Sequence, residues 1–280
     1  KTYKTLIKPY LTEQQINLLS QIYKLWHLAY DDVRVNMLGQ VFPMKPTSLS
    51  MMANDVCNSR CQMCSIWQQK KDQEITVENL SKVLSDPFFS EIRHVGITGG
   101  EPTLRPDLPE LYQAVCTSLP KIDAASIITN AILEDVVKER VLASAAVCKQ
   151  HNINFGVMVS LDGVGEVHDE VRGRKGNFDS AIHTINYFRQ QNIPTSFGCT
   201  ITRSNALYVD ELLDYAISEG LYGRFRIAEF IDRLYNSTQT EFIRNFDEKT
   251  AYHLGLFFFR AEHDFETHSA HQKTYRSIRA

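Results

Sequence analysis

From residue 47 onward, the hydrophobic positions alternate between a period of two residues and a period of three to four. Short stretches with a strand-like pattern lie at 47–53, 92–98, 124–130, 154–162, 195–202 and 224–230. Between and after them, apolar residues recur with helical spacing at 76–85, 108–119, 133–150, 177–191, 205–218 and 248–265. The pattern therefore predicts six strand–helix units in a row.

Such an alternation predicts a parallel sheet with right-handed crossovers. A closed barrel of this kind has eight strands, and the pattern supplies six. We therefore expect an α/β fold, a partial (β/α)6 TIM-like barrel. A flat doubly wound sheet is the alternative, because the pattern alone does not separate the two.

The region before the first strand has a different character. Residues 12–30 have the pattern of an amphipathic helix, with Ile16, Leu19, Ile22 and Trp26 at steps of three or four. We expect three parts: a short N-terminal helical extension with its connector at 1–46, the barrel at 47–247, and a C-terminal helix and tail at 248–280. The last part is consistent with the start of a truncated extension.

Composition narrows the classes of protein. The chain has 280 residues, of which 43% are hydrophobic and 22% charged, with a formal net charge of −3, as in a globular enzyme rather than a nucleic-acid-binding protein. Its longest apolar runs, such as LGLFFF at 254–259, are too short to cross a bilayer. The N-terminal stretch lacks the apolar core of a signal peptide. We expect a cytoplasmic protein with reduced thiols and no membrane span.

The six cysteines fall into two groups. Cys116, Cys148 and Cys199 stand alone among apolar residues and are expected to be buried. The other three, spaced C-x3-C-x2-C, directly follow the first predicted strand, and active sites of parallel α/β folds form at the carboxyl ends of strands. A closed zinc or iron–sulfur site uses four protein ligands, so three thiols leave one position open. The three are Cys57, Cys61 and Cys64.

The stretch NDVCNSRCQMCSIW resembles the cysteine loop of the radical S-adenosylmethionine (SAM) enzymes, with Met63 where that family often has an aromatic residue. The resemblance implies that Cys57, Cys61 and Cys64 bind a [4Fe–4S] cluster whose fourth iron is open to SAM. The alternative for these cysteines is a zinc site completed by a distant histidine.

A second motif, GITGGEPTLRPDL at 96–108, ends the second predicted strand. Its two glycines allow a close approach of the backbone to a ligand, and Glu101 offers an acceptor for an ammonium group. By itself this is ordinary turn chemistry. Its position one unit after the cysteines resembles the radical SAM segment that holds the methionyl amino group, which implies that role for Gly99, Gly100, Glu101 and Pro102.

A third motif, SLDGVGEVHDEVRGR at 160–174, follows the fourth predicted strand, where Ser160 and Asp162 are expected to point inward. The resemblance implies contacts of this strand end with SAM. It also implies an arginine for the SAM carboxylate, for which we choose Arg172, with Arg174 and Arg226 as competitors. The alternative is a surface loop with ordinary charges.

Three secondary SAM candidates and two arginines complete the set. Asn130, Thr202 and Asn205 end strands three and five in segments that resemble those lining the SAM pocket, although Asn205 is equally suited to capping the next helix. In strand six, Phe225 and Ile227 take the apolar face, so Arg224 and Arg226 are expected to face the barrel interior and to meet anions there. Four histidines of the C-terminal region are expected to be solvated, namely His253, His263, His268 and His271.

The resemblance implies a radical SAM enzyme that cleaves SAM reductively and uses the resulting 5′-deoxyadenosyl radical to abstract hydrogen from a C–H bond. The motifs look most like the branch that often carries an auxiliary-cluster (SPASM-like) extension, which favours a peptide or natural-product substrate. A sugar or lipid precursor is the second choice. A non-catalytic iron–sulfur or zinc protein is the alternative from another class. An electron donor such as flavodoxin or ferredoxin is implied, and no catalytic residue is assigned.

Overall fold

The computed structural model describes residues 44–69 and 74–279, together with isolated positions between 18 and 39. Contacts divide the chain into two compact units, Lys1–Pro46 and Thr47–Ala280. In the first unit, the described positions of the predicted helix at 12–30 are helical, including Leu18, Ile22 and Trp26. Ile16 and Leu19 lie outside the described residues.

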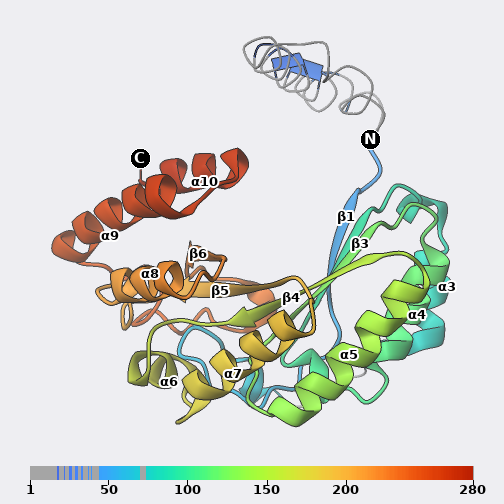
Figure 1. Ribbon diagram of the computed structural model, residues 1–280, viewed down its shortest axis with the longest axis horizontal. Coiled ribbons are helices and arrows are strands. Elements are labelled where there is room, and N and C mark those ends of the chain that lie inside the picture. Colours follow the sequence, from blue (N-terminus) through green and yellow to red (C-terminus); the bar gives the residue numbers. More distant parts are fainter. Residues whose placement is uncertain are drawn as a thin grey trace. The chain divides into compact units, whose positions relative to one another are not determined.

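The second unit contains a six-stranded parallel sheet (Figure 1). Its strands occur in the order β1-β2-β3-β4-β5-β6, and each pairs in parallel with the next. The strands are β1 (Ser48–Met52), β2 (His94–Thr98), β3 (Ala124–Thr129), β4 (Asn154–Ser160), β5 (Thr195–Ile201) and β6 (Gly223–Ile227). Each lies within a predicted strand or differs from it by one residue at the start.

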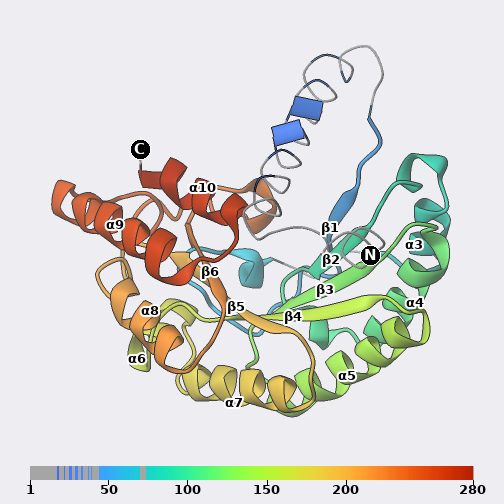
Figure 2. The same cartoon turned by 45° about the horizontal axis from the view of Figure 1, so that its top comes forward.

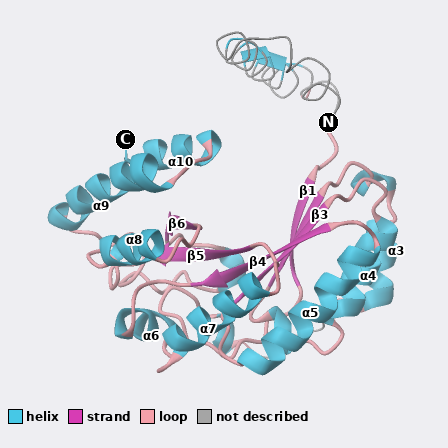
Figure 3. Ribbon diagram, in the orientation of Figure 1, coloured by secondary structure: helices cyan, strands magenta, loops and turns pink. Residues whose placement is uncertain are grey.

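Helices occupy the connections and the outer side of the curved sheet (Figures 2 and 3). They are α3 (Val77–Leu84), α4 (Leu108–Ser118), α5 (Glu134–Gln150), α6 (Glu166–Arg172), α7 (Asn177–Gln190), α8 (Val209–Ser218), α9 (Glu248–Arg260) and α10 (Ser269–Arg279). Short 3-10 turns form η3 (Ile66–Gln68), η4 (Pro87–Phe89), η5 (Pro102–Leu104) and η6 (Asp232–Leu234), and a π-helical turn forms η7 (Ala261–Phe265). The sheet and helices form a partial (β/α)6 barrel, so the expected curved architecture is confirmed.

The two faces of the sheet differ in burial. Alternate strand residues such as Val95, Ile127 and Val159 are fully buried against the helices. The residues between them face the concave side, as Thr200 and Arg226 do, and are partly or largely exposed. Period-two alternation therefore separates an apolar outer core from an open inner face.

The C-terminal helices close the β6 edge of the sheet. Phe225 of β6 lies under α9, with its ring centroid 5.0 Å from that of Phe257. The backbone N–H of Phe225 donates to the hydroxyl of Tyr275 in α10 at 3.1 Å. This bond satisfies a backbone donor of a strand that has no further strand beside it among the described residues.

The lone cysteines and the C-terminal histidines can now be placed. Cys116, Cys148 and Cys199 are buried, as predicted. The expectation of solvated histidines is wrong for His253 and His271: His253 lies 3.3 Å from Asp210, and His271 lies 3.3 Å from the buried Glu266. His271 thereby gives the buried Glu266 the partner that a buried carboxylate requires. His253 instead joins α9 to the partly exposed Asp210 of α8.

Candidate cluster and SAM site

The cysteine loop leaves β1 and binds the C-terminal end of α6. The N–H of Arg60 donates to the carbonyl of Arg172, and that of Gln62 to the carbonyl of Val171, both at 3.0 Å. The Ser59 hydroxyl also donates to the Arg172 carbonyl at 3.0 Å. The last carbonyls of a helix have no partners within the helix, so the cysteine loop satisfies those of α6.

The segment after β6 holds the other end of the cysteine loop. The N–H of Ser65 donates to the carbonyl of Leu234, and the side chain of the buried Asn236 donates to the carbonyl of Met63, both at 2.9 Å. Met63 itself is buried in a small apolar cluster that includes Val171 and Ile243. Met63, the departure from the family pattern, therefore has a packing role here.

The three thiols lie among hydrogen-bond donors. The N–H of Ser59 donates to Cys57 Sγ at 3.4 Å, and Asn130 Nδ2 donates to the same sulfur at 3.8 Å. Arg172 Nη1 donates to Cys61 Sγ at 3.7 Å. Donors of this kind stabilise the negative charge of a thiolate and are a means of tuning an iron–sulfur cluster.

Burial shapes the ionisation of the thiols. It is the main reason that the pKa of Cys57 rises to about 12 and that of Cys64 to about 11. Iron must therefore displace a proton from each thiol as it binds.

The donor set fits an iron–sulfur cluster. Within residues 44–69 and 74–279, no three His, Cys, Asp or Glu side chains converge as the ligands of a single ion would. A cluster tolerates such a spread, because each cysteine binds a different iron, and thiolates are its usual ligands. Cys57, Cys61 and Cys64 are all partly exposed and therefore accessible to a cluster.

The Gly-Gly-Glu-Pro turn after β2 packs directly on the cysteine loop. A Cβ on Gly100 would lie 2.2 Å from the Val56 carbonyl oxygen, and one on Gly99 would lie 2.6 Å from that of Asn54. The glycines were expected to allow close approach to a ligand, but here they approach the backbone that leads into Cys57. Two backbone bonds join the segments, from Gly100 N to the Asn54 carbonyl at 2.9 Å and from Glu101 N to the Val56 carbonyl at 2.8 Å.

The Glu101 carboxylate is buried and fully engaged. Its Oε1 accepts from the hydroxyls of Thr103 at 2.6 Å and Thr129 at 2.9 Å, and its Oε2 accepts from the N–H of Asn130 at 2.7 Å. Burial raises the pKa of Glu101, and these hydrogen bonds oppose the rise. The carboxylate thus ties the end of β3 to the turn after β2, with Pro102 buried beside it. Its role toward the SAM ammonium stays a prediction.

Asn130 reaches the cysteine loop from β3. Besides its contact with Cys57, its Nδ2 donates to Asn58 Oδ1 at 2.8 Å. Its own carbonyl accepts from the side chain of Asn177 at 2.9 Å. Ser160 faces the concave side at the end of β4, since Val159 and Leu161 on either side of it are fully buried. Two predicted residues thus lie at the strand ends, as expected, and their contacts with SAM remain predictions.

Asp162 and Arg172 form an ion pair at the mouth of the barrel. Arg172 Nε lies 2.6 Å from Asp162 Oδ2, a charge contact rather than a well-aligned hydrogen bond. Asp162 Oδ1 accepts from the N–H of Thr200 at 2.7 Å. Burial opposes the Arg172 charge, but Asp162 and the Cys61 thiol raise its pKa. Arg172 therefore has its own counter-ion beside the cysteine loop. Arg174, the competing candidate, instead donates to the Asn58 carbonyl at 2.5 Å.

Thr202 and Asn205 are fully buried and bonded to one another. Asn205 Oδ1 accepts from the N–H of Thr202 at 2.7 Å, and Asn205 Nδ2 donates to the Asp162 carbonyl at 2.6 Å. Helix α8 begins at Val209, so Asn205 is not its N-cap, and that alternative is wrong. Asn205 instead joins the ends of β4 and β5.

Sequence reasoning missed the groups that support the site. His168 is the clearest example: its Nδ1 accepts from the N–H of Asp162 at 2.9 Å, and its Nε2 lies 3.2 Å from Asn177 Oδ1. Burial lowers the pKa of His168 to about 4, so the ring is neutral. Its position within the third motif was the available signal, but α6, which carries it, was not predicted.

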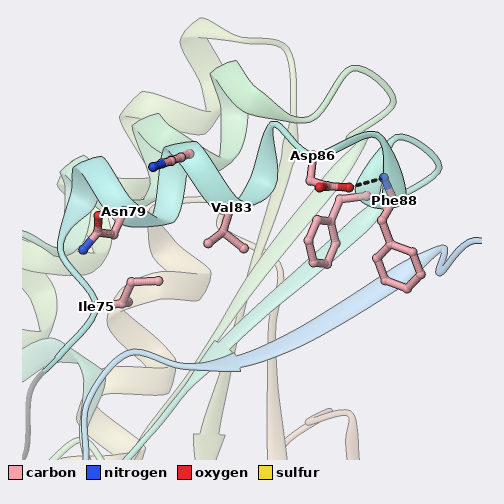
Figure 4. A pocket seen from close by; sticks show the side chains of 7 residues that line it. Ile75, Asn79, Val83, Asp86 and Phe88 are labelled. Atoms are coloured by element: carbon pink, nitrogen blue, oxygen red, sulfur yellow. Dashed lines mark hydrogen bonds between the residues drawn. The ribbon is translucent and has the colours of Figure 1, made fainter.

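A groove of about 820 Å³ lies elsewhere, between α3 and η4 (Figure 4). Ile75, Val83 and Phe88 contribute to its lining, and Asp86 accepts from the N–H of Phe88 at 2.8 Å. No predicted site residue lines this groove. Within the described part of the chain, no helix is long and apolar enough to span a membrane.

Comparison with known sequences places these motifs in a family. The model of the radical SAM superfamily matches residues 52–216. The sporulation killing factor maturation protein SkfB of Bacillus subtilis is 26% identical over 198 residues, which cover 70% of this chain and 46% of that protein. The mycofactocin maturase MftC of Mycolicibacterium smegmatis is 27% identical, over 64% of this chain and 43% of its own. The chain spans less than half the length of these two relatives.

Solved structures agree on the fold. Streptococcus suis SuiB bound to S-adenosylmethionine superposes with a TM-score of 0.61 at 17% identity, covering 97% of this chain and 63% of that one. The enzyme anSMEcpe with bound AdoMet and a Kp18Cys peptide gives a TM-score of 0.58 at 20% identity, covering 78% and 61%. At these identities the likeness concerns the fold alone.

The family match covers more than half of the chain and contains both the cysteine loop and the Gly-Gly-Glu-Pro turn. Membership implies a [4Fe–4S] cluster and SAM as cofactors, in agreement with the donor set of the loop. This chain belongs to the radical SAM superfamily.

Proposed function

We propose that this enzyme cleaves SAM reductively and uses the product to abstract hydrogen from a C–H bond of a peptide substrate. The observation that carries the first part is the direct bonding of the cysteine loop to the Gly-Gly-Glu-Pro turn, through Gly100 and Glu101. That bonding sets the proposed cluster ligands beside the proposed SAM-binding turn at one mouth of the barrel.

The roles of the residues follow from their positions. Cys57, Cys61 and Cys64 would hold the cluster. That cluster would supply the electron for the reductive cleavage of SAM. Carbonyl groups of Gly99 and Gly100 are suitable acceptors for the methionyl ammonium. Arg172, beside Cys61, is placed to compensate negative charge at the loop.

The proposed peptide substrate is supported by the relatives. Two of them are named a sporulation killing factor maturation protein and a mycofactocin maturase, and another is named PqqA peptide cyclase. A solved structure of similar fold, SuiB, contains its precursor peptide SuiA. A relative with 32% identity over 56% of this chain is instead named Fe-coproporphyrin III synthase, so a small-molecule substrate is the second candidate.

Anaerobic reconstitution tests the first part. The purified chain is supplied with iron and sulfide, reduced with dithionite or with flavodoxin or ferredoxin, and incubated with SAM. We expect 5′-deoxyadenosine by mass spectrometry and none from the variant lacking the three cysteines. Absence of 5′-deoxyadenosine from cluster-loaded wild type would contradict the proposal.

Glu101→Gln separates a role in SAM binding from a role in folding. The glutamine amide would place its N–H donors against one of the hydrogen-bond donors that surround Glu101. Some loss of stability is therefore expected whether or not Glu101 binds SAM. A role toward the ammonium predicts, in addition, a weaker SAM affinity at full cluster content. Glu110→Gln, on the exposed side of α4, is the matched control. Unchanged SAM affinity in Glu101→Gln would restrict Glu101 to positioning.

Co-expression tests the substrate. Small peptides encoded beside the gene are expressed with the enzyme and searched for a change in mass. A modified peptide would support the proposal. A modified small molecule, with no peptide changed, would favour the second candidate.

A further inference from the structure

The inner face of β6 carries a cation that forms no ion pair with an acid in the described part of the chain. Phe225 is 3% exposed beneath α9, so the alternate residue Arg226 faces the concave side, where it is exposed. Its Nε donates to the hydroxyl of Thr200 in β5 at 3.3 Å, a weak neutral contact. Among the described residues, no carboxylate lies within 4.0 Å of its guanidinium.

The acid that acts on Arg226 is already committed. Asp162 contributes to the field at Arg226, but one of its oxygens accepts from Thr200 N and the other pairs with Arg172. A row of contacts thus runs from Arg172 through Asp162 and Thr200 to Arg226. One carboxylate serves two arginines in this row, which leaves a net positive charge at the β6 end.

A second arginine adds to this charge. Arg233, in η6 just after β6, is exposed and has no ion pair in the described part of the chain. The pKa of Arg226 is lowered, first because the surrounding protein removes water from the guanidinium although part of the side chain is exposed, and then by the charges of Arg172 and Arg233. The carbonyl of Leu234, the residue after Arg233, accepts from the N–H of Ser65 at 2.9 Å, so Arg233 lies beside the cysteine loop. Within the described part of the chain, Asp232 forms no ion pair with its neighbour Arg233.

We propose that Arg226 and Arg233 form a subsite that binds a carboxylate of the peptide substrate, such as a glutamate or aspartate side chain. The inference rests on the proposed function and adds the chemical class of the substrate. Arginine suits this task because its planar fork binds a carboxylate through two parallel hydrogen bonds.

The position of the pair favours the substrate over SAM as the source of the carboxylate. β6 lies at the opposite edge of the sheet from β1 and β2, which lead into the cysteine loop and the Gly-Gly-Glu-Pro turn (Figures 1 and 2). SAM is expected between the cluster and that turn, where Arg172 already supplies a cation beside Cys61. A group bound at Arg226 and Arg233 would approach the cysteine loop from the β6 side, where the carbonyl of Leu234 bonds to Ser65. That side is opposite the Gly-Gly-Glu-Pro turn at β2 and is left for a second molecule.

Paired peptide pools test the subsite by binding alone. Two fluorescently labelled heptapeptide pools share all positions except the centre, which is Glu in one and Gln in the other. Their affinities for cluster-loaded, SAM-bound enzyme are compared by anisotropy under anaerobic conditions. We expect wild type to prefer the Glu pool about tenfold. The double variant Arg226→Gln/Arg233→Gln should lose this preference. Any fall in its affinity for SAM should be a smaller factor than the fall in its preference for the Glu pool.

Arg224→Gln is the matched control, because Arg224 lies two residues before Arg226 on the same face of β6, near the start of the strand and next to Tyr222. It should retain the preference. Arg226→Lys, which keeps the charge, should fall between wild type and the double variant, and melting curves establish that each variant is folded.

Equal affinity of wild type for both pools, or a preference retained in the double variant, would overturn the inference. A double variant that loses SAM affinity while keeping the Glu preference would assign the arginines to SAM and also overturn it. Failure of wild type to form 5′-deoxyadenosine would count against the proposed function and not against the subsite, because the pools report binding only.

Discussion

Gly100→Ala is expected to separate the turn after β2 from the cysteine loop. The added Cβ would lie 2.2 Å from the carbonyl oxygen of Val56 and 3.0 Å from the backbone nitrogen of Cys57. Both neighbours are backbone atoms, so no side-chain rotation can relieve the contact. One of the two segments has to move.

The size of the effect follows from the bonds between the segments. Movement would break or stretch three hydrogen bonds, from Gly100 N to Asn54 O, from Glu101 N to Val56 O and from Asn54 Nδ2 to Glu101 O. At about 1 kcal/mol of net stability each, the loss is about 3 kcal/mol. For a domain of this size, that loss corresponds to a fall of roughly 6–12 °C in Tm.

Thermal unfolding of the purified chain measures the loss, and iron content after reconstitution measures the effect on the cluster. Because the moved backbone leads into Cys57, cluster loading should fall with stability. Gly255→Ala is the control: it lies inside α9 with nothing within 4 Å of its added Cβ, so a gain of up to about 1 kcal/mol is expected. Wild-type Tm and iron content in Gly100→Ala would refute the reasoning.

Three further outcomes are expected. Asp162→Asn leaves Arg172 without its counter-ion and should cost about 3–5 kcal/mol in chemical denaturation, whereas Asp123→Asn, in a pair that is 59% exposed on both sides, should cost under about 1 kcal/mol. Burial lowers the pKa of His168 from 6.5 to about 4. Between these pH values the ring is therefore neutral in the folded protein and takes up a proton when the protein unfolds. Stability present above pH 6.5 should therefore decline by about 3 kcal/mol as the pH falls toward 4, and His168→Gln should flatten that decline. Replacement of the three loop cysteines, Cys57, Cys61 and Cys64, by alanine should abolish the cluster, as measured by iron content and Mössbauer spectra. Full iron content in this variant would exclude these residues as ligands.

The strands and most helices of the barrel were predictable because their signals are local. Strand residues alternate and helix residues recur at three to four, whatever the rest of the chain does. Helix α6 escaped prediction because it has only seven residues, between Gly165 and Gly173, and four of them are charged. Its stability depends on tertiary contacts, since the cysteine loop bonds to its last carbonyls.

The candidate site was predictable as a set of positions but not as a set of contacts. The rule that parallel strands end at one edge brought together Cys57, Glu101, Asn130 and Asp162. The rule does not predict that the carboxylate of Glu101 is occupied by hydrogen bonds from Thr103, Thr129 and Asn130, because these partners depend on how the strand ends pack.

The sequence by itself determined the order of strands and helices, the spacing of the three thiols and the motifs of the family, because each depends on residues close together in the chain. Only the tertiary structure decided that the sheet curves, that the two glycines meet the backbone before Cys57, and that Arg172 rather than Arg226 pairs with the buried carboxylate of Asp162. Charges find partners according to distance and burial, and both arise only when segments remote in the chain pack together.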